Sequence, residues 1–159
     1  MLFALPMRRA RWLFYQANVT YLMGDRDLAL KQLRANNEIH KDKSGWLLGF
    51  KILEMMITID NKDFYLVSFM NDRLVQVLHK NKQANIARAK IICQIIRAFL
   101  RFDCNFQKTI DKVPDKFALL ENEENEYYWD IMSYEVIRFD QWFRERAQRK
   151  SASSKPASS

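Results

Sequence analysis

Tyr21-Leu22-Met23-Gly24-Asp25-Arg26-Asp27-Leu28-Ala29-Leu30 is the stretch of sequence that decides the fold. This stretch contains a short polar turn, which joins two segments, Arg8–Met23 and Asp27–His40. In both segments apolar residues recur at helical spacing. Similar turns follow at Asp60–Phe64 and Phe102–Phe106, after spacings of 36 and 42 residues. In each turn an Asp or Asn can accept hydrogen bonds from the first N–H groups of the next helix. Three such turns predict repeated two-helix units.

The rest of the chain also has the periodicity of helices and lacks the alternation of strands. Only three Gly and three Pro occur among 159 residues, too few for a turn-rich sandwich or barrel. The expected fold is therefore all-α, with about three antiparallel helix pairs and a long C-terminal helix. The predicted helices are Arg8–Met23, Asp27–His40, Trp46–Ile59, Phe64–His79, Ala84–Phe102, Asn105–Asp111 (followed by a break at Pro114) and Asn125–Lys150.

The first unit resembles the tetratricopeptide repeat, because Ala17, Gly24 and Ala29 lie at that family's spacing for two close helix contacts and a helix end. The resemblance implies a right-handed solenoid with a concave binding face built from the first helix of each pair. We expect one domain over residues 1–150, with units at about 8–41, 45–80 and 84–113, a closing helix at 125–150 and a disordered tail at 151–159. The later units are degenerate: Leu53 and Ile95 stand in place of Ala17, and Tyr65 and Gln107 in place of Ala29.

The same resemblance places groove positions in the first unit at Arg11, Phe14, Asn18 and Tyr21. Asn18 corresponds to the asparagine with which some members of the family hold a peptide terminus. Phe14 stands where a lysine is expected, which argues against a complete carboxylate clamp.

A block free of acidic residues runs from Arg73 to Arg101, and an acidic segment without Lys or Arg runs from Glu121 to Glu135. Helical spacing places Lys90, Arg97 and Arg101 of this block on one face. One interpretation is that this face captures an acidic peptide or a C-terminal carboxylate. The other is that the acidic segment neutralises it. The candidate binding residues are Arg88, Lys90, Arg97 and Arg101.

Composition limits the function classes. The chain has 26 Lys and Arg against 19 Asp and Glu, a net charge of +7, which permits an acidic protein or nucleic acid as partner. Two Cys and two His exclude a disulfide framework and an ordinary Cys/His zinc site. No apolar run approaches the roughly 18 residues of a membrane span. The N-terminus lacks the order of a secretory signal, so we expect a cytoplasmic protein with reduced cysteines.

No set of convergent titratable side chains predicts catalysis. His40 lies near a predicted helix end beside Lys41 and Asp42, where a solvated histidine is expected, and His79 has no nucleophile or carboxylate at helical spacing. We therefore expect a non-enzymatic interaction scaffold, without metal or cofactor, that binds a protein or acidic peptide through its concave face. The alternative is a basic helical domain that binds nucleic acid, although aromatic residues are not interleaved with the basic block. Extra aromatic residues on the predicted C-terminal helix suggest a homodimer contact there.

Overall fold

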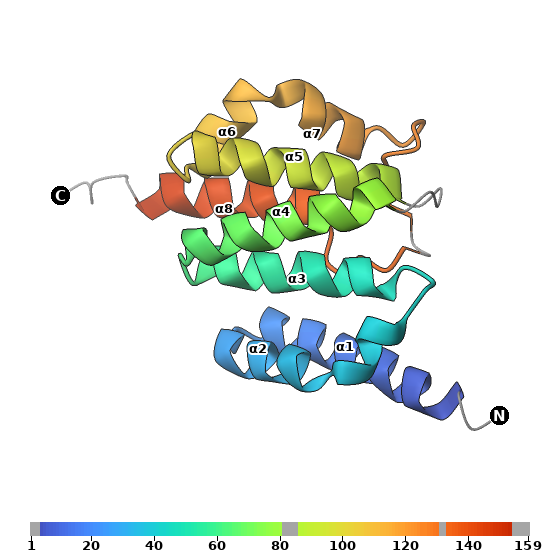
Figure 1. Cartoon of the computed structure of the whole chain (residues 1–159). Coiled ribbons are helices and arrows are strands. Elements are labelled where there is room, and N and C mark those ends of the chain that lie inside the picture. Colours follow the sequence, from blue (N-terminus) through green and yellow to red (C-terminus); the bar gives the residue numbers. More distant parts are fainter. Residues whose placement is uncertain (1–3, 81–85, 131–132, 154–159) are drawn as a thin grey trace. The chain divides into compact units, whose positions relative to one another are not determined.

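The computed structural model describes residues 4–80, 86–130 and 133–153, and within these residues every regular element is a helix (Figure 1). The all-α prediction is confirmed. The elements are α1 (Ala4–Leu22), α2 (Arg26–Ala35), the 3₁₀ helix η1 (Asn37–Lys41), α3 (Trp46–Asp60), α4 (Phe64–Lys80), α5 (Ala87–Arg101), α6 (Phe106–Lys112), α7 (Pro114–Glu121) and α8 (Phe139–Ser153).

The described residues divide into two compact units, with the boundary inside α4. The first unit comprises residues 4–70 and 133–137, and the second comprises residues 71–130 and 138–153. Each unit is described by itself below.

The first unit is organised around the hairpin of α1 and α2. Ala17 of α1 and Ala29 of α2 are both fully buried, as expected for small residues where two helices pack closely. Phe14 and Tyr21 extend the buried face of α1, which packs on α2, η1 and α3. This face is part of the core of the unit, to which α3 contributes further buried residues such as Met56 and Ile57.

The turn after α1 has the hydrogen bonds of a Schellman motif followed directly by a helix cap. The N–H of Asp25 donates to the carbonyl of Thr20 at 3.2 Å, and Gly24 has a φ of +94°. The side chain of Asp25 then accepts a hydrogen bond from the N–H of Leu28 at 3.0 Å. One turn therefore ends α1 and begins α2.

The turn after α3 repeats this arrangement. Asp63 donates its N–H to the carbonyl of Thr58 at 3.2 Å, and its side chain accepts from the N–H of Leu66 at 3.2 Å. Lys62 takes the place of Gly24 with a φ of +60°. The predicted repetition of the turn is confirmed here.

The turn after α5 is the same motif with one added residue. Cys104 donates its N–H to the carbonyl of Phe99 at 2.9 Å, and Asp103 has a φ of +61°. The cap is Asn105, whose side chain accepts from the N–H of Lys108 at 2.9 Å. Cys104 is the added residue, and its own φ is +52°.

These turns correct the predicted register of the later units by one or two residues. The caps Asp25 and Asp63 are 38 residues apart, so the position of Ala29 corresponds to Val67 and not to Tyr65. Val67 is fully buried, whereas Tyr65 is 88% exposed. By the same register, Thr109 and not Gln107 corresponds to Ala29 in the third unit. Met55 in place of Leu53, and Ile96 in place of Ile95, correspond to Ala17 in the second and third units. Thr109, Met55 and Ile96 are all buried.

The second unit has an aromatic core formed by α5, α6, α7 and α8. The ring of Phe143 on α8 lies 5.7 Å from Phe99, 4.8 Å from Phe106 and 5.3 Å from Phe117, measured between ring centroids. Offset and edge-on ring pairs of this kind are favourable. Trp142, also on α8, is buried beside Phe143.

The prediction of one long C-terminal helix from Asn125 is wrong, because α8 begins at Phe139. Asn122 and Asn125 each accept a hydrogen bond from the N–H two residues on, in Asx turns that compete with the helix. The homodimer contact expected on this helix rested on the extra apolar residues Tyr127, Tyr134 and Ile137, and all three precede α8. Ile131 and Met132, which fall within the predicted helix, lie outside the described residues.

The ends of two further helices differ from the prediction. The helix expected to reach His40 ends at Ala35, where the buried Asn36 donates its side-chain amide to the carbonyl of Ala10 at 2.7 Å. The chain then continues as η1. The predicted tail from residue 151 is helical as far as Ser153, and residues 154–159 lie outside the described residues.

Candidate binding surface on α5

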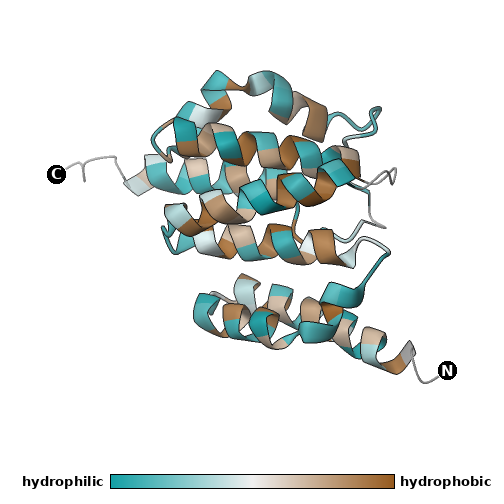
Figure 2. Ribbon diagram, viewed as in Figure 1, coloured by the Kyte–Doolittle hydropathy of each residue, from teal (hydrophilic) through white to brown (hydrophobic). Residues whose placement is uncertain are grey.

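Helix α5 presents one exposed strip on an otherwise buried or half-buried helix. The exposed positions recur every three or four residues, which places them on one side of the helix. Figure 2 shows the resulting alternation of hydrophilic and hydrophobic residues along α5. The strip consists of Lys90, Gln94, Arg97 and Arg101. We refer to these four residues as the α5 strip.

A shallow groove runs beside the α5 strip, with α4 on its other side. Its volume is about 190 Å³. Leu78 and Cys93 are almost fully buried and give it an apolar floor, and His79 adds a titratable side chain on α4. The lining residues are Val75, Leu78, His79, Lys90, Cys93, Gln94 and Arg97.

The charges of the α5 strip are accessible. Arg97 forms an ion pair with Asp72 at 3.3 Å, but the two side chains are 57% and 62% exposed. An exposed pair of this kind contributes only about 0–1 kcal/mol, so a carboxylate from a partner can replace Asp72. Among the residues that the structure describes, Lys90 and Arg101 have no ion pair.

Lys116 of α7 extends the positive surface next to the strip. Its ammonium group donates a hydrogen bond to the side-chain oxygen of Gln94 at 2.7 Å. This contact orients Gln94 and leaves its amide N–H₂ group as a donor. Lys116 lies beyond the basic block, which ends at Arg101, so the charge pattern of the sequence did not indicate it.

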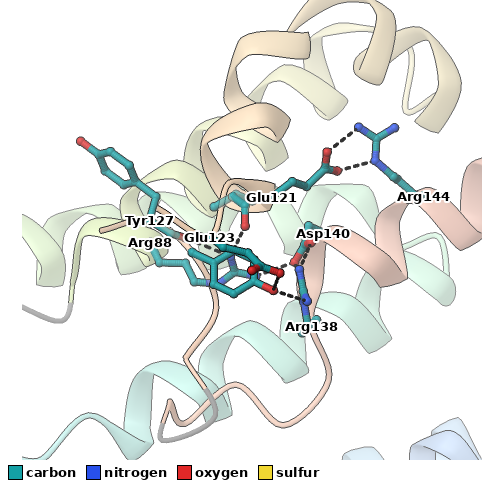
Figure 3. A network of polar contacts seen from close by, with 9 residues as sticks. Arg88, Glu121, Glu123, Tyr127, Arg138, Asp140 and Arg144 are labelled. Carbon is teal, nitrogen blue, oxygen red and sulfur yellow. Dashed lines mark hydrogen bonds and ion pairs between the residues drawn. The ribbon is translucent and has the colours of Figure 1, made fainter. Parts of the chain in front are cut away.

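Arg88 does not belong to the binding surface, and its assignment as a candidate is wrong. Arg88 is only 7% exposed, and its guanidinium donates a hydrogen bond to the carboxylate of Asp140 at 2.6 Å (Figure 3). It also donates to the backbone carbonyls of Leu120 at 3.2 Å and Tyr127 at 3.0 Å. The hydrogen bonds of Arg88 therefore stabilise the end of α7 and the segment after it.

The acidic segment is engaged by other side chains. Glu121 forms an ion pair with Arg144 on α8, and this hydrogen bond raises the pKa of the Arg144 guanidinium above its ordinary value (Figure 3). Glu123 accepts a hydrogen bond from the hydroxyl of Tyr128 at 3.4 Å. These contacts direct two of the segment's acids to partners outside the α5 strip.

The four groove residues assigned in the first unit are not an open surface. Phe14, Asn18 and Tyr21 are 1%, 1% and 5% exposed, because this side of α1 packs against its neighbours in the unit. Asn18 donates its amide to the carbonyl of Phe14 at 2.9 Å, and Tyr21 donates its hydroxyl to Asp60 at 2.5 Å.

Arg11, the fourth of these residues, is half-buried. Its guanidinium carbon lies 5.0 Å from the ring centroid of Trp46, and a terminal nitrogen lies 3.7 Å from a carboxylate oxygen of Asp42. The side chain fastens α1 to the start of α3, so it contributes to the packing of the unit.

Cys93, in the floor of the groove, is a poor nucleophile. Burial raises the pKa of its thiol from an ordinary value of 9.0 to about 12, although Arg97 opposes the shift. The thiol is therefore protonated at neutral pH. In residues 4–80, 86–130 and 133–153 no group of three metal-ligating side chains occurs, and no helix there is long and apolar enough to cross a membrane.

Comparison with known proteins finds no protein-family model, no curated protein and no solved structure that matches this chain.

Three of the four residues of the α5 strip could be predicted from the sequence, whereas the groove beside the strip could not. Val75, Leu78 and Cys93 are ordinary apolar positions in the sequence, and only the packing of α4 on α5 brings them together. Their helical spacing indicates buried faces and nothing more specific.

Proposed function

We propose that this protein is a non-enzymatic interaction module that binds an acidic segment of a partner protein on the α5 strip. The observation that carries the proposal is the exposure of Lys90, Arg97 and Arg101 on one face of α5, beside a groove with an apolar floor. Positive charge next to apolar surface suits a peptide that combines carboxylates with an apolar side chain.

The size of the strip sets the length of the ligand. Lys90 and Arg101 are eleven residues apart on a helix, a span of about 16 Å at a rise of about 1.5 Å per residue. An extended peptide of about five residues covers that length. Carboxylates near its two ends would pair with Lys90 and Arg101, and a central apolar side chain would enter the groove.

We further propose that the helices belong to a tetratricopeptide-like repeat array. The support is the recurrence of one turn motif after α1, α3 and α5, with an Asp or Asn cap each time. In such an array α5 is the first helix of the third pair, and the resemblance assigns the binding face to the first helices. The α5 strip fits that role.

Nucleic acid is the second candidate, favoured by the net charge of +7 and by the cations of the α5 strip. The strip itself argues against single-stranded ligands, because its four positions carry no aromatic ring on which a base could stack.

A titration monitored by fluorescence anisotropy tests the proposal. The probes are a labelled peptide with glutamates flanking a central leucine, the same peptide with lysine in place of glutamate, a single-stranded RNA and a duplex DNA. Of the two peptides, we expect only the acidic one to show saturable binding. We expect both nucleic acids to bind more weakly than the acidic peptide. Tighter binding of RNA or DNA, with a steep loss of affinity as salt rises, would favour the second candidate instead.

A further inference from the structure

Helix α1 carries a second apolar face in addition to the one buried in the first unit. Trp12 and Leu22 are 71% and 66% exposed, which is unusual for side chains of this size. The exposed apolar residues on this face are Leu5, Trp12, Tyr15, Val19 and Leu22. We call this set, together with Arg8, the α1 stripe.

The α1 stripe has the spacing of a helix-pairing seam. Leu5, Trp12 and Val19 are seven residues apart, and so are Arg8, Tyr15 and Leu22. Together they occupy the two core positions of a heptad repeat over the length of the 19-residue helix. A helix that is apolar on two sides is typical of one packed between two neighbours.

The α1 stripe is complementary to itself when two copies run antiparallel. Aligning residue 5 with residue 22 of a second copy also aligns Arg8 with Val19 and Trp12 with Tyr15. Each pair joins one kind of heptad core position to the other, as antiparallel helix pairs require. Two-fold symmetry then repeats every contact, which gives the closed interface of a dimer.

Charge favours the antiparallel orientation over the parallel one. Arg8 occupies a core position of the heptad pattern. In the antiparallel register it lies beside the apolar Val19 of the other copy, whereas parallel pairing would place Arg8 beside Arg8 of the other copy, and like charges repel.

We infer that the α1 stripe is a homodimer interface in which α1 pairs antiparallel with α1 of a second copy of this chain. The α1 stripe and the α5 strip have no residue in common.

Sedimentation equilibrium of the full chain over a concentration series tests the interface. We expect the mass to rise with concentration from 19.1 kDa towards twice that value. Val19→Glu, which puts a charge into the seam, should shift the midpoint of this rise to at least tenfold higher concentration. Ala35→Glu is the matched control, since it adds the same carboxylate at an exposed position of α2 and should leave the mass curve in place.

Disulfide cross-linking tests the orientation. A tagged Leu5→Cys chain and an untagged Leu22→Cys chain are mixed and oxidised, with the chain carrying only Cys93 and Cys104 as the control. Antiparallel pairing predicts a cross-linked species of mixed size. Cross-linking of either variant mainly to itself would overturn the orientation. The inference would be overturned if the chain stayed monomeric at every concentration. That holds also if the α1 stripe then paired with a different protein.

Discussion

The guanidinium of Arg88 on α5 donates a 2.6 Å hydrogen bond to the carboxylate of Asp140 on α8, 52 residues away in the sequence. The two side chains are 9% and 2% exposed, and Asp140 also accepts from Arg138 at 2.7 Å. Because Arg88 donates to the carbonyls of Leu120 and Tyr127 as well, this one side chain connects α5, the end of α7 and the start of α8. Arg88 therefore has a structural role, although it lies within the basic block.

Asp140→Ala should destabilise the protein strongly, because it leaves the buried Arg88 without its counter-charge. Loss of one partner of a buried pair costs about 3–5 kcal/mol of unfolding free energy. Asp72→Ala is the control, since it breaks the exposed pair with Arg97 and should cost at most about 1 kcal/mol. Urea denaturation of both variants measures the difference. Equal costs for the two variants would contradict the structural role of Arg88.

Ala17→Leu and Ala29→Leu should each lower stability, because both positions are fully buried at the contact between α1 and its neighbours. Overpacking of a filled core costs about 1–3 kcal/mol. Ala35→Leu adds the same side chain at an exposed position of α2 and should change the melting temperature little. Melting curves that coincide for all three variants would contradict the close packing of the first hairpin.

Gly49→Ala should destabilise the first unit, although alanine is the better helix former. On propensity alone the change, at the fourth residue of α3, would stabilise the helix by about 1 kcal/mol. A Cβ at this position, however, would overlap the backbone carbonyl of Tyr134, which cannot withdraw as a flexible side chain could. The sign of the change in melting temperature is therefore diagnostic. A rise would show that Tyr134 does not lie against α3.

The thiol of Cys93 should resist alkylation up to strongly alkaline pH. Its pKa of about 12 in the folded protein lies above its ordinary value of 9.0, so at pH 8 it is almost entirely protonated. Since the unfolded chain releases this proton first, the contribution to stability is complete below about pH 9 and is lost as pH rises towards about 12. Iodoacetamide labelling followed by peptide mass analysis should modify Cys93 at pH 8 only after denaturation. Rapid labelling of Cys93 in the native protein would contradict its burial.

Local signals in the sequence predicted most of the helices but not the register of the repeats. The caps Asp25, Asp63 and Asn105 are visible as turn residues, and the structure confirms each of them. The shift in register arises because Lys62 and Asp103 adopt the left-handed conformation that Gly24 adopts in the first turn. A glycine would have marked these positions, and lysine or aspartate does not.

The error in the last helix has a non-local cause. Periodic apolar residues after Asn125 predicted a helix. The carbonyl of Tyr127, however, accepts a hydrogen bond from Arg88, which is 39 residues earlier in the chain. Asn125 also binds its own backbone in a turn. The first of these contacts cannot be read from a window of neighbouring residues.

The candidate site could be predicted in part. Helical spacing correctly placed Lys90, Arg97 and Arg101 on one exposed face of α5. It could not separate Arg88, whose burial depends on a carboxylate in α8. In α1 both faces are apolar, so periodicity alone could not show that Phe14 faces the core and Trp12 faces solvent.

Charge reversal on the α5 strip tests the proposed function most directly. The double variant R97E/R101E is compared with K31E/R34E, which reverses two exposed charges on α2 and lowers the net charge of +7 by the same amount. Affinity for the labelled acidic peptide is measured by anisotropy, and a melting curve confirms that each variant is folded. We predict at least a tenfold loss of affinity in R97E/R101E and less than a twofold change in K31E/R34E. Equal affinity in the two folded variants would contradict binding on the α5 strip.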